Sequence, residues 1–282
     1  MIIYKEAAAL AIKLEHLKKE DCTIGFIPTM GALHPGHLSV LNQSIEAGNI
    51  TIFSIFVNPT QFNDQKDFEK YPITIENDIY LLEKTGTNIL FLPSVDEMYP
   101  EGLQPTAAYN LGSMETMLEG FYRPGHFQGV CRIVHKLLNI VQPHHLYMGQ
   151  KDYQQCMVVR KLINDFNIPT LLNIVPTQRE ETGLAMSSRN TRLSQPARQQ
   201  ASAIYRAHVL VKNNLLKLSL NELKALANDT IMSAGFEKID YIEICDAISL
   251  QPAVHYSEDQ KLVILSAAFI ESVRLIDNLQ LN

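Results

Sequence analysis

Two histidines three residues apart lie in a glycine-containing turn near the start of the chain. His34 and His37 belong to the stretch PTMGALHPGH (28–37), which follows a short apolar run and precedes a helical pattern. Glycine lets a ligand approach the backbone closely, and the first turn of a helix presents unpaired N–H groups that attract phosphate. Imidazole N–H groups can also stabilise charge that develops in a transition state. The turn therefore predicts phosphoryl chemistry, whereas zinc would need a third ligand that is absent nearby.

Two later stretches carry groups that suit phosphate oxygens. Lys151 in GQKD (149–152) provides a point charge, and Asp152 could bind a ribose hydroxyl or cap the following helix. In MSSRN (186–190), two hydroxyls and the guanidinium of Arg189 are phosphate ligands. Taken alone, MSSRN is also compatible with a solvated polar turn. Its combination with the histidine turn favours a nucleotide site.

Amide and carboxylate side chains are candidates for a second, smaller ligand. Asn58 and Gln61 lie in NPTQF directly after an apolar run, and Gln61 offers a donor and an acceptor together. An ordinary Asn-Pro turn explains the same residues equally well. Gln155 could face the same crevice. Asp78 could hold Mg²⁺ through water, or it could be a solvated carboxylate.

Strands that alternate with helices must position these groups. β-branched and aromatic runs predict strands, and apolar residues at helical spacing predict helices. This alternation indicates a Rossmann-like parallel sheet of the α/β class, whose ligands collect beyond the carboxyl ends of the strands. The predicted strands are 22–28, 50–57, 88–92, 145–148 and 170–175, and the predicted helices are 1–20, 38–47, 75–84, 127–141 and 152–165.

The pattern changes after residue 176. A polar stretch (177–190) is followed by two helical patterns, at 197–216 and 220–234, and then by short strand patterns at 241–245, 262–267 and 273–277. We therefore predict two domains. Residues 1–176 form the Rossmann-like domain, and residues 177–282 form a smaller α+β domain that begins with the SSRN segment and acts as a lid.

Composition excludes several classes of protein. The 282 residues carry 24 Lys and Arg against 30 Asp and Glu, and a formal net charge of −6 disfavours binding to nucleic acid. No export signal and no run of 18 apolar residues is present, so we expect no membrane contact. The four cysteines are widely spaced, which favours reduced thiols and a cytoplasmic location.

The combined motifs resemble a known family. HPGH and MSSRN resemble the HIGH and KMSKS signatures of the α/β superfamily that transfers adenylate. The fuller set of PTMGALHPGH, FVNPTQF, MLEGFYRPGHF, GQKDYQQ and GLAMSSRN, in this order, resembles the pantoate–β-alanine ligase family over nearly the whole chain. The resemblance implies a nucleotidyltransferase fold, a homodimer, ATP as co-substrate with Mg²⁺, and condensation of pantoate with β-alanine through pantoyl-adenylate.

The resemblance also implies roles for individual residues. His37 corresponds to the catalytic histidine, with His34, Lys151 and Arg189 acting beside it on phosphate. Gln61, Gln155 and Asn58 correspond to the pantoate pocket, and Asp78 to a carboxylate associated with Mg²⁺. The implied ATP-binding residues are Met30, Gly31, Ala32, Leu33, His34, Pro35, Gly36, His37, Gly149, Gln150, Lys151, Asp152, Gln178, Met186, Ser187, Ser188 and Arg189.

Two departures from the family pattern weaken a metal site held by the protein. Ile73 stands where arginine is expected, and Asn77 precedes Asp78 where a second acid can occur. Mg²⁺ is therefore expected to travel with the ATP phosphates. Two other functions stay open at this point: a nucleotidyltransferase that stops at the adenylate or joins nucleotides, and a nucleotide-binding sensor without turnover.

Overall fold

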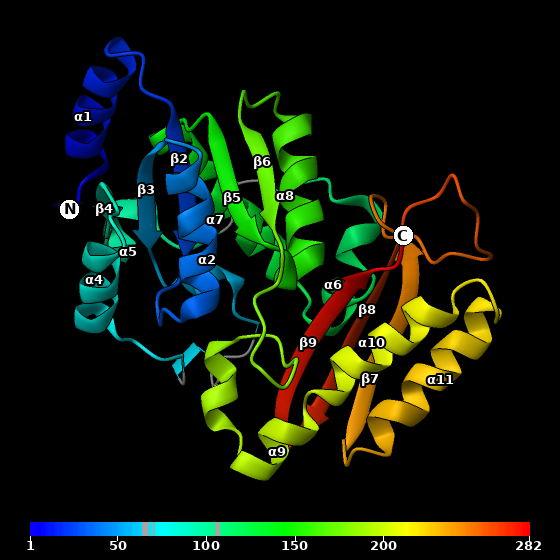
Figure 1. Cartoon of the computed structure of the whole chain (residues 1–282). Coiled ribbons are helices and arrows are strands. Elements are labelled where there is room, and N and C mark those ends of the chain that lie inside the picture. Colours follow the sequence, from blue (N-terminus) through cyan, green and yellow to red (C-terminus); the bar gives the residue numbers. More distant parts are fainter. Residues whose placement is uncertain (64–67, 70, 105–107) are drawn as a thin grey trace. The chain divides into compact units, whose positions relative to one another are not determined.

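The computed structural model describes residues 1–63, 68, 69, 71–104 and 108–282. These residues form two compact units, shown along the chain in Figure 1. The first unit contains Met1–Gly149 and Val158–Val175, and the second contains Gln150–Met157 and Pro176–Asn282. The sequence prediction drew one boundary after residue 176 and did not separate residues 150–157 from the first domain.

The first unit is built on a six-stranded parallel sheet, which confirms the predicted α/β class. The strand order is β1-β4-β3-β2-β5-β6. The strands are β1 (Ile2–Tyr4), β2 (Ile24–Thr29), β3 (Ile50–Ile55), β4 (Ile89–Phe91), β5 (His145–Gly149) and β6 (Leu171–Val175).

The central strands are buried on both faces. Phe26, Ile52 and Phe53 have no exposed surface. Parallel strands covered on both faces have nearly continuous apolar sequences, and this is why the runs at 24–29 and 50–55 were recognisable. The edge strand β1 was not predicted, because its three residues lie within a segment whose leucine spacing indicates a helix. That helix begins only at Ala7.

Helices connect the strands of the first unit. The apolar face of α2 packs with Phe53, Leu90 and Tyr147 of the sheet. Helix α8 starts in the second unit and ends in the first. The helices are α1 (Ala7–Lys19), α2 (Pro35–Glu46), α4 (Ile75–Lys84), α5 (Val95–Met98), α6 (Glu119–Tyr122), α7 (His126–Val141) and α8 (Tyr153–Asp165), with single 3₁₀ turns η1 (Pro59–Gln61), η2 (Gly112–Glu115) and η3 (Gln150–Asp152).

The order of the strands identifies where a ligand should bind. From β2 the chain passes to β3 on one side, and it later places β5 on the other side of β2. The carboxyl ends of two such strands border the crevice in which α/β sheets bind ligands. The histidine turn follows β2 and Gly149 ends β5, so both stretches lie at this position.

The second unit contains an antiparallel sheet of β7 (Lys238–Asp246), β8 (Leu262–Ile270) and β9 (Val273–Gln280). Helices α10 (Ala203–Asn214) and α11 (Leu220–Met232) share an apolar core with it and run beside it in Figure 1. The single helix predicted at 197–216 is wrong. It divides into α9 (Gln195–Gln200) and α10, which are separated by a turn at residues 201 and 202.

No helix in the described part of the chain combines the length and the apolar character that a membrane span requires.

Candidate active site

The backbone of the histidine turn enters the left-handed region, which glycine adopts without steric cost. Gly31 has a φ of +83° and Ala32 a φ of +52°. A Cβ at Gly31 would lie 2.9 Å from Oδ2 of Asp78 and 3.0 Å from Cγ2 of Ile55. Glycine is therefore required here both for its backbone angle and for the absence of a side chain.

Asp78 holds this turn in place. Its carboxylate is fully buried and accepts hydrogen bonds from the backbone N–H groups of Ala32 and Leu33, each at 2.9 Å. The hydroxyl of Thr74 donates to the same carboxylate at 3.0 Å. Asp78 thus satisfies two backbone donors that no helix or strand pairs, and it fixes the path of the chain into α2.

These bonds leave Asp78 poorly suited to bind a metal ion. Its two oxygens already accept three hydrogen bonds. Within the described ranges, no group of three or more His, Cys, Asp and Glu side chains could hold a metal ion. The donor set around Asp78 therefore does not fit an Mg²⁺ site formed by the protein.

The two histidines adopt one tautomer. Nδ1 of His34 accepts from the backbone N–H of Gly36 at 3.1 Å and caps α2, and Nδ1 of His37 accepts from the backbone N–H of His34 at 3.4 Å. The ring centroids are 4.0 Å apart. A neutral imidazole that accepts at Nδ1 carries its proton at Nε2. The two hydrogen bonds therefore place the ring proton of each histidine on Nε2.

Asn58 follows β3 and is saturated by contacts within the protein. Its amide Nδ2 donates to Gln61 Oε1 and to the Gly129 carbonyl, each at 3.1 Å. Its Oδ1 accepts from the Tyr99 hydroxyl at 2.7 Å and from both the backbone N–H and the hydroxyl of Thr60. Asn58 is 1% exposed. These contacts suit a residue that orients Gln61 better than one that binds a substrate itself.

Gln61 has a fixed orientation as a result. Because its Oε1 accepts from Asn58, its Nε2 points the other way and lies 3.0 Å from Sδ of Met30 in the histidine turn. The backbone carbonyl of Gln61 accepts from Nδ1 of His126 at 2.8 Å. Gln61 therefore presents an amide N–H beside the turn, which suits a carboxylate or hydroxyl oxygen.

Sequence reasoning missed the residues that support this amide pair. Burial raises the pKa of Tyr99, so its hydroxyl stays protonated and donates to Asn58. The guanidinium of Arg132 lies 4.5 Å from the centroid of the Tyr99 ring. At Gly129, a Cβ would lie 2.1 Å from the Thr60 carbonyl, so only glycine lets α7 approach this closely. No short motif joins these positions, because they are distant in sequence.

In the second unit, η3 carries the predicted phosphate ligand Lys151. Its Nζ lies 3.8 Å from Oδ1 of Asp152, which is half exposed. The side chain of Gln150 donates to Oδ1 of Asn278 at 3.1 Å. The side chain of this predicted ATP residue is therefore bonded to another residue of the second unit. Gln155 is half-buried on α8, and its neighbour Gln154 is 2% exposed.

The residues predicted around MSSRN form the end of a hairpin in the second unit. The carbonyl of Gln178 accepts from the backbone N–H of Met186 at 3.0 Å. Ser187 caps the 3₁₀ turn η4 (Ser188–Arg192), because its hydroxyl accepts from the backbone N–H of Arg189 at 3.3 Å. Ser187, Ser188 and Arg189 are all half-buried. In the first unit, the structure thus joins the histidine turn to Gln61 through Met30 and to Asp78 through the backbone of Ala32 and Leu33.

Comparison with known proteins decides the family. The family model for pantoate-beta-alanine ligase matches residues 2–280. The chain belongs to the pantoate–β-alanine ligase family. It is 40% identical over 281 residues to a pantothenate synthetase of Cytophaga hutchinsonii, covering 99% of both chains. It is 43% identical over 280 residues to that of Leptospira biflexa, covering 99% of this chain and 98% of the relative.

Solved structures of the family agree with the fold. The crystal structure of pantothenate synthetase from Thermus thermophilus matches with a TM-score of 0.92 and 36% identity, covering 100% of this chain and 99% of that one. The Francisella tularensis pantoate–β-alanine ligase, solved with β-γ ATP and β-alanine, matches with a TM-score of 0.79 and 37% identity, covering 100% and 98%. The chain is therefore an ATP-dependent ligase for pantoate and β-alanine.

Proposed function

We propose that the ligase works in two steps at the residues described above. In the first step, a pantoate carboxylate oxygen attacks the α-phosphorus of ATP, a P–O bond forms, and pyrophosphate leaves. In the second step, the amine of β-alanine attacks the acyl carbon, the C–O bond breaks, and AMP leaves with that oxygen as the amine loses a proton. Adenylation is needed because a free carboxylate has no adequate leaving group. The observation that carries this proposal is the histidine turn at the strand-order switch, with both Nδ1 atoms occupied.

The proposed role of His34 and His37 follows from their tautomer. Each Nε2–H can donate to a phosphate oxygen and stabilise the charge that grows as pyrophosphate departs. A neutral imidazole is a poor proton donor, so the bonds at Nδ1 support a hydrogen-bonding role for His37 over proton transfer. The surrounding residues Met30 to Gly36 would contact ATP through their backbone.

Gln61 is proposed to bind pantoate through its amide N–H, with Asn58 as the residue that positions it. Gln155 is proposed as a second pantoate contact, consistent with its half-buried place on α8. A pocket that keeps water from the acyl-adenylate would protect it until the amine arrives.

The second unit is proposed to supply the remaining ATP contacts. Lys151, Ser187, Ser188 and Arg189 would bind phosphate oxygens, and Asp152 the ribose. Gly149, Gln150, Gln178 and Met186 would act mainly through their backbones. Residues 177–282 would then behave as a lid that moves with its bound phosphates and shields the adenylate from water.

Mg²⁺ is proposed to enter as the ATP complex. The carboxylate of Asp78 is committed to the turn, so its proposed role is to position Ala32 and Leu33. Mg²⁺ commonly binds through substrate phosphates and keeps several waters, which fits this arrangement. A homodimer in the cytoplasm is also proposed. The dimer rests on the resemblance to the family, and the location is consistent with four cysteines that form no disulfide.

One incubation tests the proposed function. The chain is mixed with ATP, pantoate and β-alanine, and AMP and pantothenate are measured together; we expect equal amounts of both. Exchange of labelled pyrophosphate into ATP should require pantoate but not β-alanine. Exchange without any carboxylate would indicate a different nucleotidyltransferase, and ATP binding without turnover would indicate a sensor.

A further inference from the structure

Asn278 on β9 holds the turn that carries Lys151. Its side-chain Nδ2 donates to the backbone carbonyls of Gln150 and Lys151, each at 2.9 Å. Its Oδ1 accepts from Nε2 of Gln150 at 3.1 Å. Asn278 is 2% exposed, so these bonds form out of contact with water and are geometrically demanding. One buried amide therefore fixes the backbone of two predicted ATP residues.

Asp277, the preceding residue, bonds to the hairpin that leads to the other predicted ATP-binding stretch of the second unit. Its carboxylate accepts two parallel bonds from Arg179, from Nη1 at 2.7 Å and from Nη2 at 3.0 Å. Its Oδ1 also accepts from the backbone N–H of Asn278 at 2.8 Å. The pair is thus rigid and directional, because a bidentate arginine fixes both partners.

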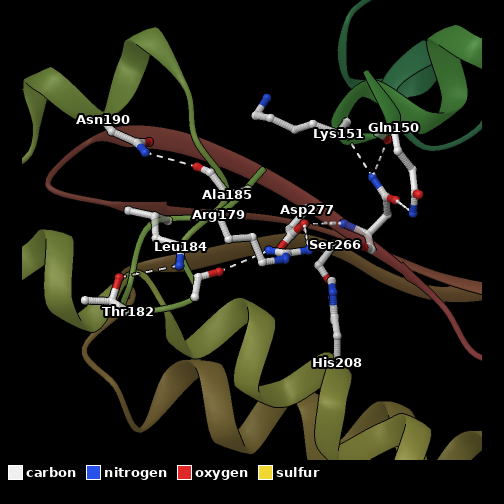
Figure 2. A network of polar contacts seen from close by, with 12 residues as sticks. Gln150, Lys151, Arg179, Thr182, Leu184, Ala185, Asn190, His208, Ser266 and Asp277 are labelled. Carbon is white, nitrogen blue, oxygen red and sulfur yellow. Dashed lines mark hydrogen bonds and ion pairs between the residues drawn. The ribbon is translucent and has the colours of Figure 1, made fainter. Parts of the chain in front are cut away.

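Arg179 is at the base of the hairpin that leads to Met186–Arg189. Its Nη1 also donates to the Gly183 carbonyl at 3.1 Å, and its guanidinium lies 3.8 Å from the centroid of the Tyr205 ring. Arg179 pairs with Ala185 across the hairpin, and Asn190 donates to the Ala185 carbonyl at 3.0 Å. Figure 2 shows the bonds of Arg179 with Asp277 and of Asn190 with Ala185, and the Lys151 side chain extends away from them.

We propose that Asp277 and Asn278 form a positioning element for ATP, which keeps Lys151 and the Met186–Arg189 stretch in one fixed arrangement. The inference rests on the proposed ATP contacts of the second unit. Neither residue touches ATP in this account; Asn278 acts through the backbone of Lys151, and Asp277 acts through Arg179. Lys151 and the Met186–Arg189 stretch would then already be in place when the triphosphate binds. Less conformational entropy would be lost on binding.

A structural role alone is the competing explanation, since breaking a buried ion pair destabilises a fold whatever its function. The same sheet provides a control for that effect. Asp240 on β7 is equally buried, with 3% of its side chain exposed, and its carboxylate binds Arg274 at 2.8 Å and Lys238 at 2.7 Å. Both of these partners lie on strands of the sheet, so Asp240→Asn should weaken the fold without changing ATP binding.

The test is a double-mutant cycle on ATP affinity, measured by calorimetry with the full chain. Asn278→Ala and Lys151→Ala are each expected to raise the Kd for ATP at least about tenfold. If Asn278 acts through Lys151, the double variant should bind ATP within about twofold of Lys151→Ala alone, because coupled residues are not additive. Asp277→Asn should also raise the Kd for ATP, while Asp240→Asn should leave it within about twofold of the wild type.

Asn278→Asp provides a second variant of unchanged size, in case the alanine variant fails to fold. Its carboxylate would face the two carbonyl oxygens, so it should weaken ATP binding at least as much as alanine does. Fully additive effects of Asn278→Ala and Lys151→Ala, or equal effects of Asp277→Asn and Asp240→Asn, would overturn the inference. Product formation by the wild type is measured separately. A wild type that binds ATP but makes no pantothenate contradicts the proposed function and leaves this affinity test intact.

Discussion

The two units hold their candidate site residues in different ways. In the first unit, Asp78, Asn58 and Gln61 are 0%, 1% and 8% exposed, and their side chains bond to one another or to nearby backbone. In the second unit, Lys151 and Arg189 are half-buried. Here a buried residue fixes the backbone rather than the side chain, as when Asn278 donates to the Lys151 carbonyl.

This difference fits the proposal that residues of the first unit bind pantoate and residues of the second unit bind the ATP phosphates. Buried amides with a fixed orientation suit the recognition of a small acid, because each hydrogen bond then selects for one position of the substrate's oxygen atoms. Half-buried cations suit a triphosphate, because its several charged oxygens can be bound by side chains in more than one orientation. In the proposed account, side-chain bonds order the candidate pantoate residues of the first unit, and bonds to the backbone order the candidate ATP residue Lys151 of the second.

His37→Ala should reduce the rate of adenylation by about two orders of magnitude or more, because it removes a donor to the phosphate in the transition state. Pantoate-dependent pyrophosphate exchange measures this rate. His16→Ala on the exposed face of α1 is the matched control and should have normal activity. Near-normal exchange by the His37 variant would remove this residue from the mechanism.

Gln61→Ala should raise the KM for pantoate about thirtyfold and leave the KM for ATP within about twofold, since a bond to a charged group is worth roughly 2 kcal/mol. Asn58→Ala should show the same selectivity, because it frees the Gln61 amide to rotate. Gln43→Ala on the exposed side of α2 is the control. Equal changes in both KM values would show that this pocket does not distinguish acid from nucleotide.

Asp78→Asn should affect both substrates and the fold. An amide has one acceptor oxygen, so one backbone donor of the turn loses its partner at a cost of about 2 kcal/mol. We expect the free energy of unfolding to fall by about that amount and turnover to fall about tenfold. Glu76→Gln, an exposed acid on the same helix, controls for lost charge. Restoration of activity in the Asp78 variant by excess Mg²⁺ would instead favour a metal role.

His208 should make the second unit sensitive to acid without changing catalysis. Burial lowers the pKa of this histidine to about 4, with the Arg179 charge acting in the same direction and Asp277 opposing it. Between pH 6.5 and about 4, His208 is therefore protonated in the unfolded chain and neutral in the folded chain. The free energy of unfolding falls as the pH drops through this range. The expected loss between neutral pH and about pH 5 is roughly 2 kcal/mol.

Urea unfolding at the two pH values measures the loss that His208 causes. His208→Gln, which can keep a bond to Ser266 Oγ, should lose correspondingly less stability in acid. An unchanged pH dependence in this variant would assign the acid sensitivity to other groups.

Much of the fold could be predicted from sequence because its signals are local. Strands β2 to β6 were visible as apolar runs, and α4 and α7 as periodic patterns, whereas the edge strand β1 was not predicted. The split of the helix at residues 201 and 202 was not visible, since the buried residues Ala197, Ala201 and Ile204 keep helical spacing across it. The order of the strands, which locates the crevice, is not encoded in any single segment.

The candidate site shows the same limit. The motifs predict site roles for His37, Gln61, Lys151 and Arg189, because these residues lie in short local sequence patterns. The residues proposed to orient them are Tyr99, Arg179, Asp277 and Asn278, and each meets its partner only after folding. The sequence left a solvated carboxylate open for Asp78, and its complete burial contradicts that alternative, while its bonds to the backbone hold the histidine turn.

The most direct test of the account follows the oxygen atoms of pantoate. The chain is incubated with ATP, β-alanine and pantoate labelled with ¹⁸O in its carboxylate, and AMP is analysed by mass spectrometry. If the carboxylate attacks the α-phosphorus, AMP leaves with one labelled oxygen and pantothenate retains the other in its amide carbonyl. Unlabelled AMP, or label in the released pyrophosphate, would contradict a pantoyl-adenylate intermediate.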